Sequence, residues 1–418
     1  MDDNLDVEQA LRPYITVASQ TFGKDITTGR TMRLAEYVGS PHERLKVVHI
    51  AGTSGKTSTS YYIRALLEAA GQTTGLTVSP HITNIAERVQ LHGSPLNSKK
   101  FVQYLQEFLQ FIKTVPETPT YFELLLVFAL WVFDRENVNY AVLETGLGGL
   151  HDSTNICRRN DKICVLTDIG YDHMQILGNS LAEITAQKSG IIATDNVVVM
   201  HKQADEIMCV VEKETSKQRA RSILAKNNEL TVDNMDMAEY QKRNWSLAYA
   251  VYQQVKKRDG LPELSLESLQ ETMQIQVPGR MEIFEIKGKK VILDGAHNEQ
   301  KMRVFVASFE HKFSDKKPLI LLGMKQEKDI DKVVAILASI TERVVATEPS
   351  IIQDLPLGTL PSGSIAESVR RHGIECHEES NAKRALNWAL SQPNDMIIIT
   401  GSLYLVAEIR ALISSNVV

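Results

Sequence analysis

Short apolar segments rich in β-branched residues alternate with longer segments of helical periodicity in the first part of the chain. The apolar segments lie at 45–52, 138–146, 162–170 and 196–201. Between the first two, residues 61–71 carry apolar side chains at helical spacing and end in a glycine, which is typical of a helix C-terminus. This alternation predicts βαβ units and an α/β fold with a mostly parallel sheet.

A second series of apolar segments begins after the Pro-Gly step at 278–279. Its members lie at 289–298, 317–324, 343–348 and 395–402, and helix-like stretches at 335–340 and 381–392 separate them. This series predicts a second, smaller, Rossmann-like domain. Since 418 residues exceed the size at which one core stops growing, we expect two domains, residues 1–280 and 281–418.

Composition and charge argue against several classes of partner and of site. The chain has 46 basic and 51 acidic residues, so it offers no broad cationic surface for nucleic acid or anionic lipid. The acidic N-terminus has no signal-peptide pattern and no apolar run is long enough to span a membrane, so we expect a cytoplasmic protein. The four cysteines form no CxxC pair, which suggests neither a zinc site nor a disulfide framework; we expect them to be reduced and mostly buried.

The first predicted strand runs directly into GTSGKTS at 52–58 and then into a predicted helix. In this order, backbone N–H groups at the helix start can face phosphates. Gly52 and Gly55 allow a tight turn and a close approach to an anion, and Lys56 can reach the outer phosphates. A hydroxyl of Thr57 or Ser58 would hold magnesium.

This loop is a short variant of the phosphate-binding pattern, because Ile50 stands where the longer form has a glycine. The alternative is a glycine-rich turn capped by Thr53 or Ser54 with a surface lysine. The strand before the loop and the helix after it favour phosphate binding. We therefore expect residues 52–58, including Thr53 and Ser54, to contact ATP.

Further motifs occur in order along the whole chain. They are SPHI at 79–82, ERV at 87–89, TYFE at 120–123, LETGLGGLHDSTN at 143–155, DIGYDHMQILGNSLAEITAQKSGII at 168–192, PGRME at 278–282, LDGAHN at 293–298 and TGSLYLVAEIR at 400–410. Together with HIAGTSGKTS at 49–58 they resemble the Mur ligase superfamily and, within it, folylpolyglutamate synthase and its dihydrofolate synthase relatives.

The resemblance implies a P-loop-type ATPase domain followed by the smaller Rossmann-like domain. It implies an ATP-dependent ligase that adds L-glutamate to the carboxylate of folate, with dihydropteroate as an open second acceptor, through an acyl phosphate. ATP, glutamate and the pterin acceptor would be its partners, and we expect a monomer. Because phosphate-binding residues would come from both domains, closure would exclude water and ATP hydrolysis without acceptor would be slow.

The resemblance also implies metal-binding residues, with magnesium expected at two sites. Glu144 and Ser79 would lie at the first magnesium, His173 would bind the second, and Lys188 would be carboxylated so that it bridges to metal. Without the resemblance, the Asp172-His173 pair is a turn and Lys188 is an ordinary lysine at a helix end.

In the second half, Arg280 resembles an arginine that contacts the ATP phosphates, and Asp294 a carboxylate that holds the ribose. His297 would face the γ-phosphate or the incoming amino acid, and Asn244 would touch the adenine. Lys56, Lys188, Arg280 and His297 would thus be the catalytic residues. Taken alone, the polar residues of the second half would be loop or cap residues.

For the acceptor, the resemblance implies that Phe122 and Asp152 hold the pterin and aminobenzoyl groups, although Phe122 serves equally well as a core residue. Two positions depart from the family pattern. Thr57 and Ser58 follow the loop lysine in place of glycine and serine, and Leu150-His151 replaces an arginine and a leucine. Two alternatives stay open: a Mur-type ligase for another carboxylate, and a non-catalytic nucleotide-binding module.

Overall fold

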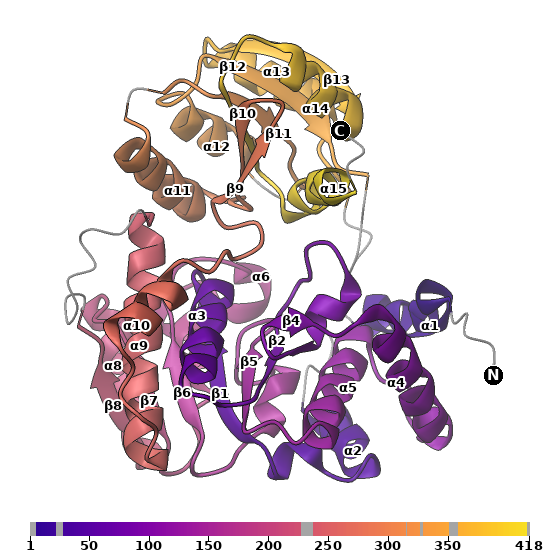
Figure 1. The fold of residues 1–418 in the computed structure, drawn as a ribbon, viewed down its shortest axis with the longest axis vertical. Helices are drawn as coiled ribbons and strands as arrows, with labels where there is room; N and C mark the ends of the chain where they lie inside the picture. Colours follow the sequence, from indigo (N-terminus) through magenta and orange to yellow (C-terminus); the bar gives the residue numbers. More distant parts are fainter. Residues whose placement is uncertain are drawn as a thin grey trace. The chain divides into compact units, whose positions relative to one another are not determined.

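The computed structural model of the chain describes residues 6–21, 28–226, 237–314, 316–326, 329–350 and 358–415 (Figure 1). They pack as two compact units. The first lies within Met1–Met235 and Lys242–Ile275, and the second within Asp236–Gln241 and Gln276–Val418. Whether residues 1–280 and 281–418 are independent folding domains stays a prediction.

An eight-stranded sheet of order β4-β3-β2-β5-β1-β6-β7-β8 forms the centre of the first unit. Strands β2, β5, β1, β6, β7 and β8 are neighbours in this order and run parallel. Strand β3 pairs antiparallel with both β2 and β4. Buried apolar residues fill the central strands, as expected for a sheet covered on both faces. The strands are β1 (Lys46–Ala51), β2 (Thr74–Thr77), β3 (Gln90–Leu91), β4 (Ser94–Pro95), β5 (Tyr140–Glu144), β6 (Ile163–Leu166), β7 (Val197–Met200) and β8 (Arg221–Leu224).

Helices precede, connect and follow these strands. They are α1 (Val7–Thr21), α2 (Gly29–Tyr37), α3 (Lys56–Ala69), α4 (Ser98–Phe111), α5 (Tyr121–Arg135), α6 (Met174–Leu177), α7 (Leu181–Ser189), α8 (Asp205–Lys217), α9 (Glu239–Asp259) and α10 (Leu266–Met273), with short 3-10 turns η1 (Pro41–Glu43), η2 (Ile85–Arg88), η3 (Ile112–Thr114) and η4 (Ser153–Ile156).

Helix α5 is buried along most of its length and begins with a capping box, in which Thr120 and Glu123 bond each other's backbone N–H. Its Phe128 ring lies 5.5 Å from Phe101 and 5.3 Å from Phe108 on α4. This aromatic packing fixes α5, and with it the position of Phe122 in its first turn.

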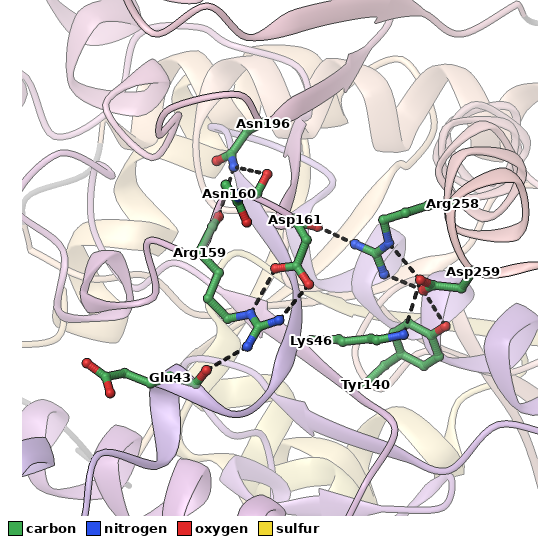
Figure 2. Close-up of polar contacts among 9 residues, drawn as sticks. All are labelled: Glu43, Lys46, Tyr140, Arg159, Asn160, Asp161, Asn196, Arg258 and Asp259. Carbon is green, nitrogen blue, oxygen red and sulfur yellow. Dashed lines mark hydrogen bonds and ion pairs between the residues drawn. The ribbon is translucent and has the colours of Figure 1, made fainter.

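A polar network joins the end of α9 to the starts of two central strands (Figure 2). The Asp259 carboxylate accepts hydrogen bonds from Lys46 Nζ on β1 at 3.1 Å and from the Tyr140 hydroxyl on β5 at 2.6 Å. Arg258 Nη2 donates to the same carboxylate at 2.5 Å. This network lies at the amino ends of the strands, so its role is structural.

A six-stranded sheet of order β13-β12-β11-β14-β10-β9 forms the second unit, and only β9 runs antiparallel to its neighbour. Its strands are β9 (Glu282–Ile286), β10 (Lys289–Leu293), β11 (Leu319–Leu322), β12 (Arg343–Glu348), β13 (Glu375–Asn381) and β14 (Met396–Thr400). Its helices are α11 (Glu299–Lys312), α12 (Ile330–Leu337), α13 (Ser362–Arg371), α14 (Ala382–Ser391) and α15 (Leu403–Ser414).

The predicted α/β class with two mostly parallel sheets is confirmed. The helix expected at 335–340 ends earlier, at Leu337 of α12. Among the described residues, none of the helices combines the length and the apolar character that crossing a membrane requires. The cysteines are free thiols; Cys157 and Cys164 are buried, but Cys209 is exposed and Cys376 is half-buried, so the expectation that most are buried holds for only two.

Candidate active site

The predicted phosphate loop connects β1 to α3, and both of its glycines are sterically required. Gly52 and Gly55 have φ values of 153° and 87°. A Cβ atom on Gly52 would lie 1.9 Å from Thr167 Oγ1, and one on Gly55 would lie 2.5 Å from Asn244 Oδ1. The loop therefore passes tightly beside the end of β6 and the side chain of Asn244 on α9, as only glycine allows.

Backbone hydrogen bonds hold this loop in place. The N–H groups of Thr53 and Ser54 donate to the carbonyl oxygen of Asp168 at 2.8 and 3.1 Å. The Thr53 hydroxyl donates to the Gly170 carbonyl at 2.9 Å, which gives Thr53 a structural role beside the predicted one. Arg243 Nη2 donates to the Asp168 carboxylate at 2.7 Å, so α9 is tied to the same segment. Within the described residues, the buried Ser54 Oγ has no hydrogen-bond partner.

Two lysine amines meet at one carbonyl oxygen of the loop. Lys56 Nζ donates to Gly52 O at 3.1 Å, and Lys188 Nζ donates to the same atom at 2.9 Å. Lys188 lies in the last turn of α7 and its side chain is buried. The structure thus brings Lys188 to the phosphate loop, beside Lys56.

Oxygen atoms of a kind that suits a hard cation gather where β5 ends. Thr57 Oγ1 donates to Glu144 Oε1 at 2.9 Å, and Ser79 N donates to Glu144 Oε2 at 3.4 Å. The Ser79 hydroxyl is buried and lacks a hydrogen-bond partner in the described part of the chain. Ser58 is buried as well, but the contact to the carboxylate comes from Thr57. This geometry favours Thr57 as the metal-binding hydroxyl.

His173 lies at the start of α6 with φ 49°, and its side chain is about half exposed. Its Nε2 atom lies 3.9 Å from Asp172 Oδ2. Over the described ranges, no group of three or more His, Cys, Asp or Glu side chains is placed to hold a metal ion. The structure therefore brings Thr57, Glu144 and Ser79 together but does not add His173 to a cluster of such ligands.

A small pocket opens beside the predicted metal ligands. Apolar side chains of α5 and polar side chains of other elements both line it; the lining residues are Thr77, Val78, Ser79, Arg88, Phe122, Leu125, Leu126 and Glu144. The Phe122 ring also lies against Gly146, where an added Cβ would come within 2.6 Å of the ring. Phe122 thus lines a pocket together with Ser79 and Glu144, and Glu144 also accepts a hydrogen bond from Thr57 of the phosphate loop.

Asp152 does not line this pocket. Its buried carboxylate accepts hydrogen bonds from the backbone N–H groups of Leu147 at 2.7 Å and Thr154 at 3.0 Å, and from the Thr154 hydroxyl. Burial raises the pKa of Asp152 above its usual value, and these hydrogen bonds offset part of that rise. The side chain caps η4 and shapes the loop after β5, and the predicted contact to substrate stays a prediction.

In the second unit, Asp294 follows β10 and is buried. Its carboxylate accepts hydrogen bonds from Met281 N and Ala296 N at 2.9 Å each and from the Tyr240 hydroxyl at 3.1 Å. Burial raises the pKa of Asp294 above its usual value, and the positive charge of Arg280 offsets part of that rise. The carboxylate therefore organises the two loops that carry the predicted site residues of this unit.

Arg280 and His297 lie on those two loops. Arg280 Nη1 donates to the Gly279 carbonyl at 2.9 Å, and a Cβ on Gly295 would lie 3.0 Å from the same nitrogen. His297 Nδ1 lies 2.8 Å from the Gly295 carbonyl and its Nε2 lies 3.3 Å from Lys301 Nζ. The structure thus places Arg280, Asp294 and His297 in one neighbourhood.

Sequence reasoning assigned no role to Arg88, Asp168 or Arg243. The motif ERV at 87–89 contains Arg88, but nothing in its spacing shows that the side chain lines a pocket. Asp168 and Arg243 are 75 positions apart, so their ion pair has no local pattern. Only the fold reveals these contacts.

Two family models match the chain. The model described as "Mur ligase middle domain" matches residues 50–283, and the model described as "Mur ligase, glutamate ligase domain" matches residues 279–403. The middle-domain match alone covers more than half of the chain.

Full-length relatives and solved structures agree with these matches. The dihydrofolate synthase/folylpolyglutamate synthase of Bacillus subtilis is 26% identical over 93% of this chain and 95% of that protein. The folylpolyglutamate synthase of Lacticaseibacillus casei is 26% identical over 91% of this chain and 93% of that protein. The crystal structure of Mycobacterium tuberculosis folylpolyglutamate synthase with ADP and AMPPCP superimposes with a TM-score of 0.82 at 25% identity, covering 97% of this chain and 98% of that one.

Proposed function

Because the chain belongs to the Mur ligase family and, within it, to the folylpolyglutamate synthase/dihydrofolate synthase family, we propose that it ligates L-glutamate to a pterin carboxylate. Folate and dihydropteroate are the two acceptors. ATP activates the carboxylate, and the product is an amide.

One observation carries this proposal most strongly: the pocket and the predicted metal site share residues. Glu144 accepts a hydrogen bond from Thr57 of the phosphate loop and also lines the pocket with Ser79 and Phe122. A carboxylate bound in this pocket would lie next to the phosphates held by the loop. Transfer of a phosphoryl group to an acceptor requires this proximity.

Nucleotide binding is proposed for residues 52–58, with Asn244 beside Gly55 at the adenosine side. The described complexes of the Mycobacterium tuberculosis enzyme with ADP and AMPPCP support this role. The oxygen atoms of Thr57, Glu144 and Ser79 suit magnesium, which would offset phosphate charge there. A second magnesium at His173, and carboxylation of Lys188, are predictions of the family resemblance.

The reaction follows from what amide formation needs. An oxygen of the acceptor carboxylate attacks the γ-phosphorus of ATP, ADP leaves, and an acyl phosphate forms on the acceptor. The amine of glutamate then attacks the acyl carbon, and inorganic phosphate leaves as the amide forms. The Lys56 amine, which donates to Gly52 O, would stabilise the charge on the transferring group.

The second unit contributes roles by resemblance. Arg280 would contact phosphates, Asp294 the ribose, and His297 the γ-phosphate or the incoming glutamate. The hydrogen bonds to Asp294 keep the loop of Arg280 in a fixed position, which supports a binding role for this neighbourhood.

Phosphate release in the presence of ATP, magnesium and glutamate tests the proposal, with tetrahydrofolate, dihydropteroate or no acceptor. We expect release that depends on one or both pterins, with an amide product detected by mass, and loss of release in Lys56→Ala. Release with a different carboxylate only would move the assignment to another Mur-type acceptor. No release with a broad panel of carboxylates would favour the non-catalytic alternative.

A further inference from the structure

We propose that Arg88 binds the reacting carboxylate of the acceptor and remains in contact with the acyl phosphate formed from it. This inference rests on the proposed function and specifies how the pocket recognises its substrate. Arg88 is 4% exposed, and it is the one cationic side chain among the described residues that line the pocket. The other polar lining groups are Ser79, Thr77 and Glu144.

The pocket has the polarity that an aromatic acid needs. Phe122, Leu125 and Leu126 of α5 supply the apolar part of the lining. Arg88, Ser79 and Glu144 line the same pocket, and Glu144 also accepts a hydrogen bond from Thr57 of the phosphate loop. A carboxylate bound in this pocket would therefore lie among side chains that include Arg88 and Glu144.

The backbone around Arg88 is fixed before any ligand binds. The Glu87 carboxylate accepts hydrogen bonds from the N–H groups of Ile82 at 2.6 Å, Thr83 at 2.9 Å and Asn84 at 3.3 Å. This bonding closes residues 82–88 into a compact turn with η2 at its end. Because the turn is already ordered, Arg88 loses little freedom when it binds a ligand.

His81 sets the orientation of the guanidinium. Arg88 Nε donates to His81 Nδ1 at 3.2 Å, and the Tyr121 ring centroid lies 5.9 Å from the guanidinium carbon. In the proposed complex, the two terminal nitrogens of the guanidinium bind the ligand. A planar pair of N–H donors matches the two oxygens of a carboxylate, or two oxygens of an acyl phosphate, which the single ammonium of lysine does not.

The test compares a ligand that has the carboxylate with one that lacks it. Equilibrium binding is measured for dihydropteroate and for its carboxamide, and for tetrahydrofolate and its γ-carboxamide, with AMPPCP and magnesium present. The wild type is expected to prefer the carboxylate by roughly 10- to 100-fold, the range of a charge-assisted hydrogen-bonded pair. In Arg88→Gln this preference should fall to about twofold, with little change for the carboxamide.

Two further variants separate this role from a structural one. Arg88→Lys keeps the charge but not the paired donors, so an intermediate preference is expected. Arg64→Lys is the matched control, because Arg64 is also buried but contacts Tyr61 and Glu68 and does not line the pocket. It should keep the wild-type preference, and AMPPCP affinity should be equal in all variants that fold.

Each outcome decides the question. A wild type that binds the carboxylate and the carboxamide equally overturns the inference without any variant. Retention of the full preference in both Arg88→Gln and Arg88→Lys also overturns it, even when the wild type forms the amide. Failure of the wild type to ligate any pterin would instead overturn the proposed function, and this inference with it.

Discussion

At the scale of single residues, the candidate site depends on a few buried polar groups whose positions the fold fixes. Glu144 ends β5, Thr57 lies in the first turn of α3, and Ser79 follows β2, so three separate elements bring their oxygens together. Buried polar groups carry a cost unless they are satisfied, and a bound metal or ligand would satisfy the Ser79 hydroxyl.

Replacing Thr57 by valine distinguishes the two candidate metal hydroxyls. Thr57→Val removes the oxygen that contacts Glu144, so kcat/KM should fall by about 100-fold or more, with a higher magnesium requirement. Ser58→Ala is the matched control and should stay within roughly threefold of the wild type. Steady-state rates over a magnesium titration provide the measurement; equal losses in both variants would contradict the assignment to Thr57.

Asp259 predicts how stability depends on pH. Burial raises its pKa, but hydrogen bonds from Arg258, Tyr140 and Lys46 outweigh burial and lower the pKa to about 2 (Figure 2). Because the folded-state pKa lies below the unfolded value of 3.8, the stabilisation is present above pH 3.8 and is lost as pH falls through about 2. Asp259→Asn should therefore cost about 2 kcal/mol at pH 7 and roughly half of that at pH 3.

Urea unfolding of both proteins at the two pH values measures this difference. The control is Asp195→Asn, because Asp195 pairs with Arg219 at the exposed surface, with half or more of each side chain in solvent. Such a pair should contribute less than about 1 kcal/mol at either pH. If Asp259→Asn lowered the free energy of unfolding by the same amount at pH 3 as at pH 7, the network would stabilise the fold by packing alone.

At the scale of elements, helix α3 shows how differently two glycines can act. Gly55 precedes α3 and Gly71 follows it, and both have positive φ, 87° and 76°. An added Cβ meets Asn244 at Gly55, but at Gly71 it would meet no atom within 4 Å. The first glycine shapes the candidate site, and the second only ends the helix.

Paired alanine substitutions test this difference. Gly71→Ala should cost about 1 kcal/mol of stability and leave ADP affinity unchanged, because only the strained φ matters. Gly55→Ala should in addition lower ADP affinity by about tenfold or more, because the Cβ displaces Asn244 or the loop. Thermal unfolding and ADP titration separate the two effects; equal ADP affinities would show that the loop does not bind the nucleotide.

The sequence predicted the long, apolar elements well and the short or polar ones poorly. Strands β1, β5, β6 and β7 in the first unit and β10, β11, β12 and β14 in the second were expected, because each is a buried apolar run next to a helix. Strands β3 and β4 have two residues each, too few for any periodicity. Strand β13 has the sequence ECHEESN, which is polar because it forms a sheet edge with most side chains exposed or half-buried.

The site residues, like the secondary structure, were predictable from the sequence only where they belong to a local motif. Gly52, Gly55 and Lys56 were recognisable because the phosphate loop is a local motif of strand, glycine turn and helix. The link from Lys188 to Gly52 spans 136 positions, and the pocket joins β2, η2, α5 and β5. Such contacts depend on tertiary packing, and the family resemblance alone pointed to Lys188.

At the scale of the whole molecule, the family resemblance predicts roles for residues of both units. Lys56 and Glu144 belong to the first, and Arg280 and Asp294 to the second. Because the net charge is −5, phosphate binding would have to depend on local cations and not on the overall field. An enzyme with this division of roles should not spend ATP until all substrates are bound.

Acceptor dependence of ATP turnover checks this expectation. Phosphate release with ATP and magnesium alone should be at least about tenfold slower than release with glutamate and a pterin acceptor. The comparison needs only the wild-type enzyme, with Lys56→Ala to subtract background. Rapid release without acceptor would contradict the coupling of ATP cleavage to the bound carboxylate.

Transfer of ¹⁸O from the acceptor tests the central claim most directly. If the carboxylate attacks the γ-phosphorus, one carboxylate oxygen must leave with the phosphate when the amide forms. With acceptor labelled by ¹⁸O in both carboxylate oxygens, mass spectrometry should therefore find one ¹⁸O atom in inorganic phosphate for each amide produced, with ADP as the nucleotide product. Amide formation with unlabelled phosphate, or with AMP as product, would contradict an acyl-phosphate ligase.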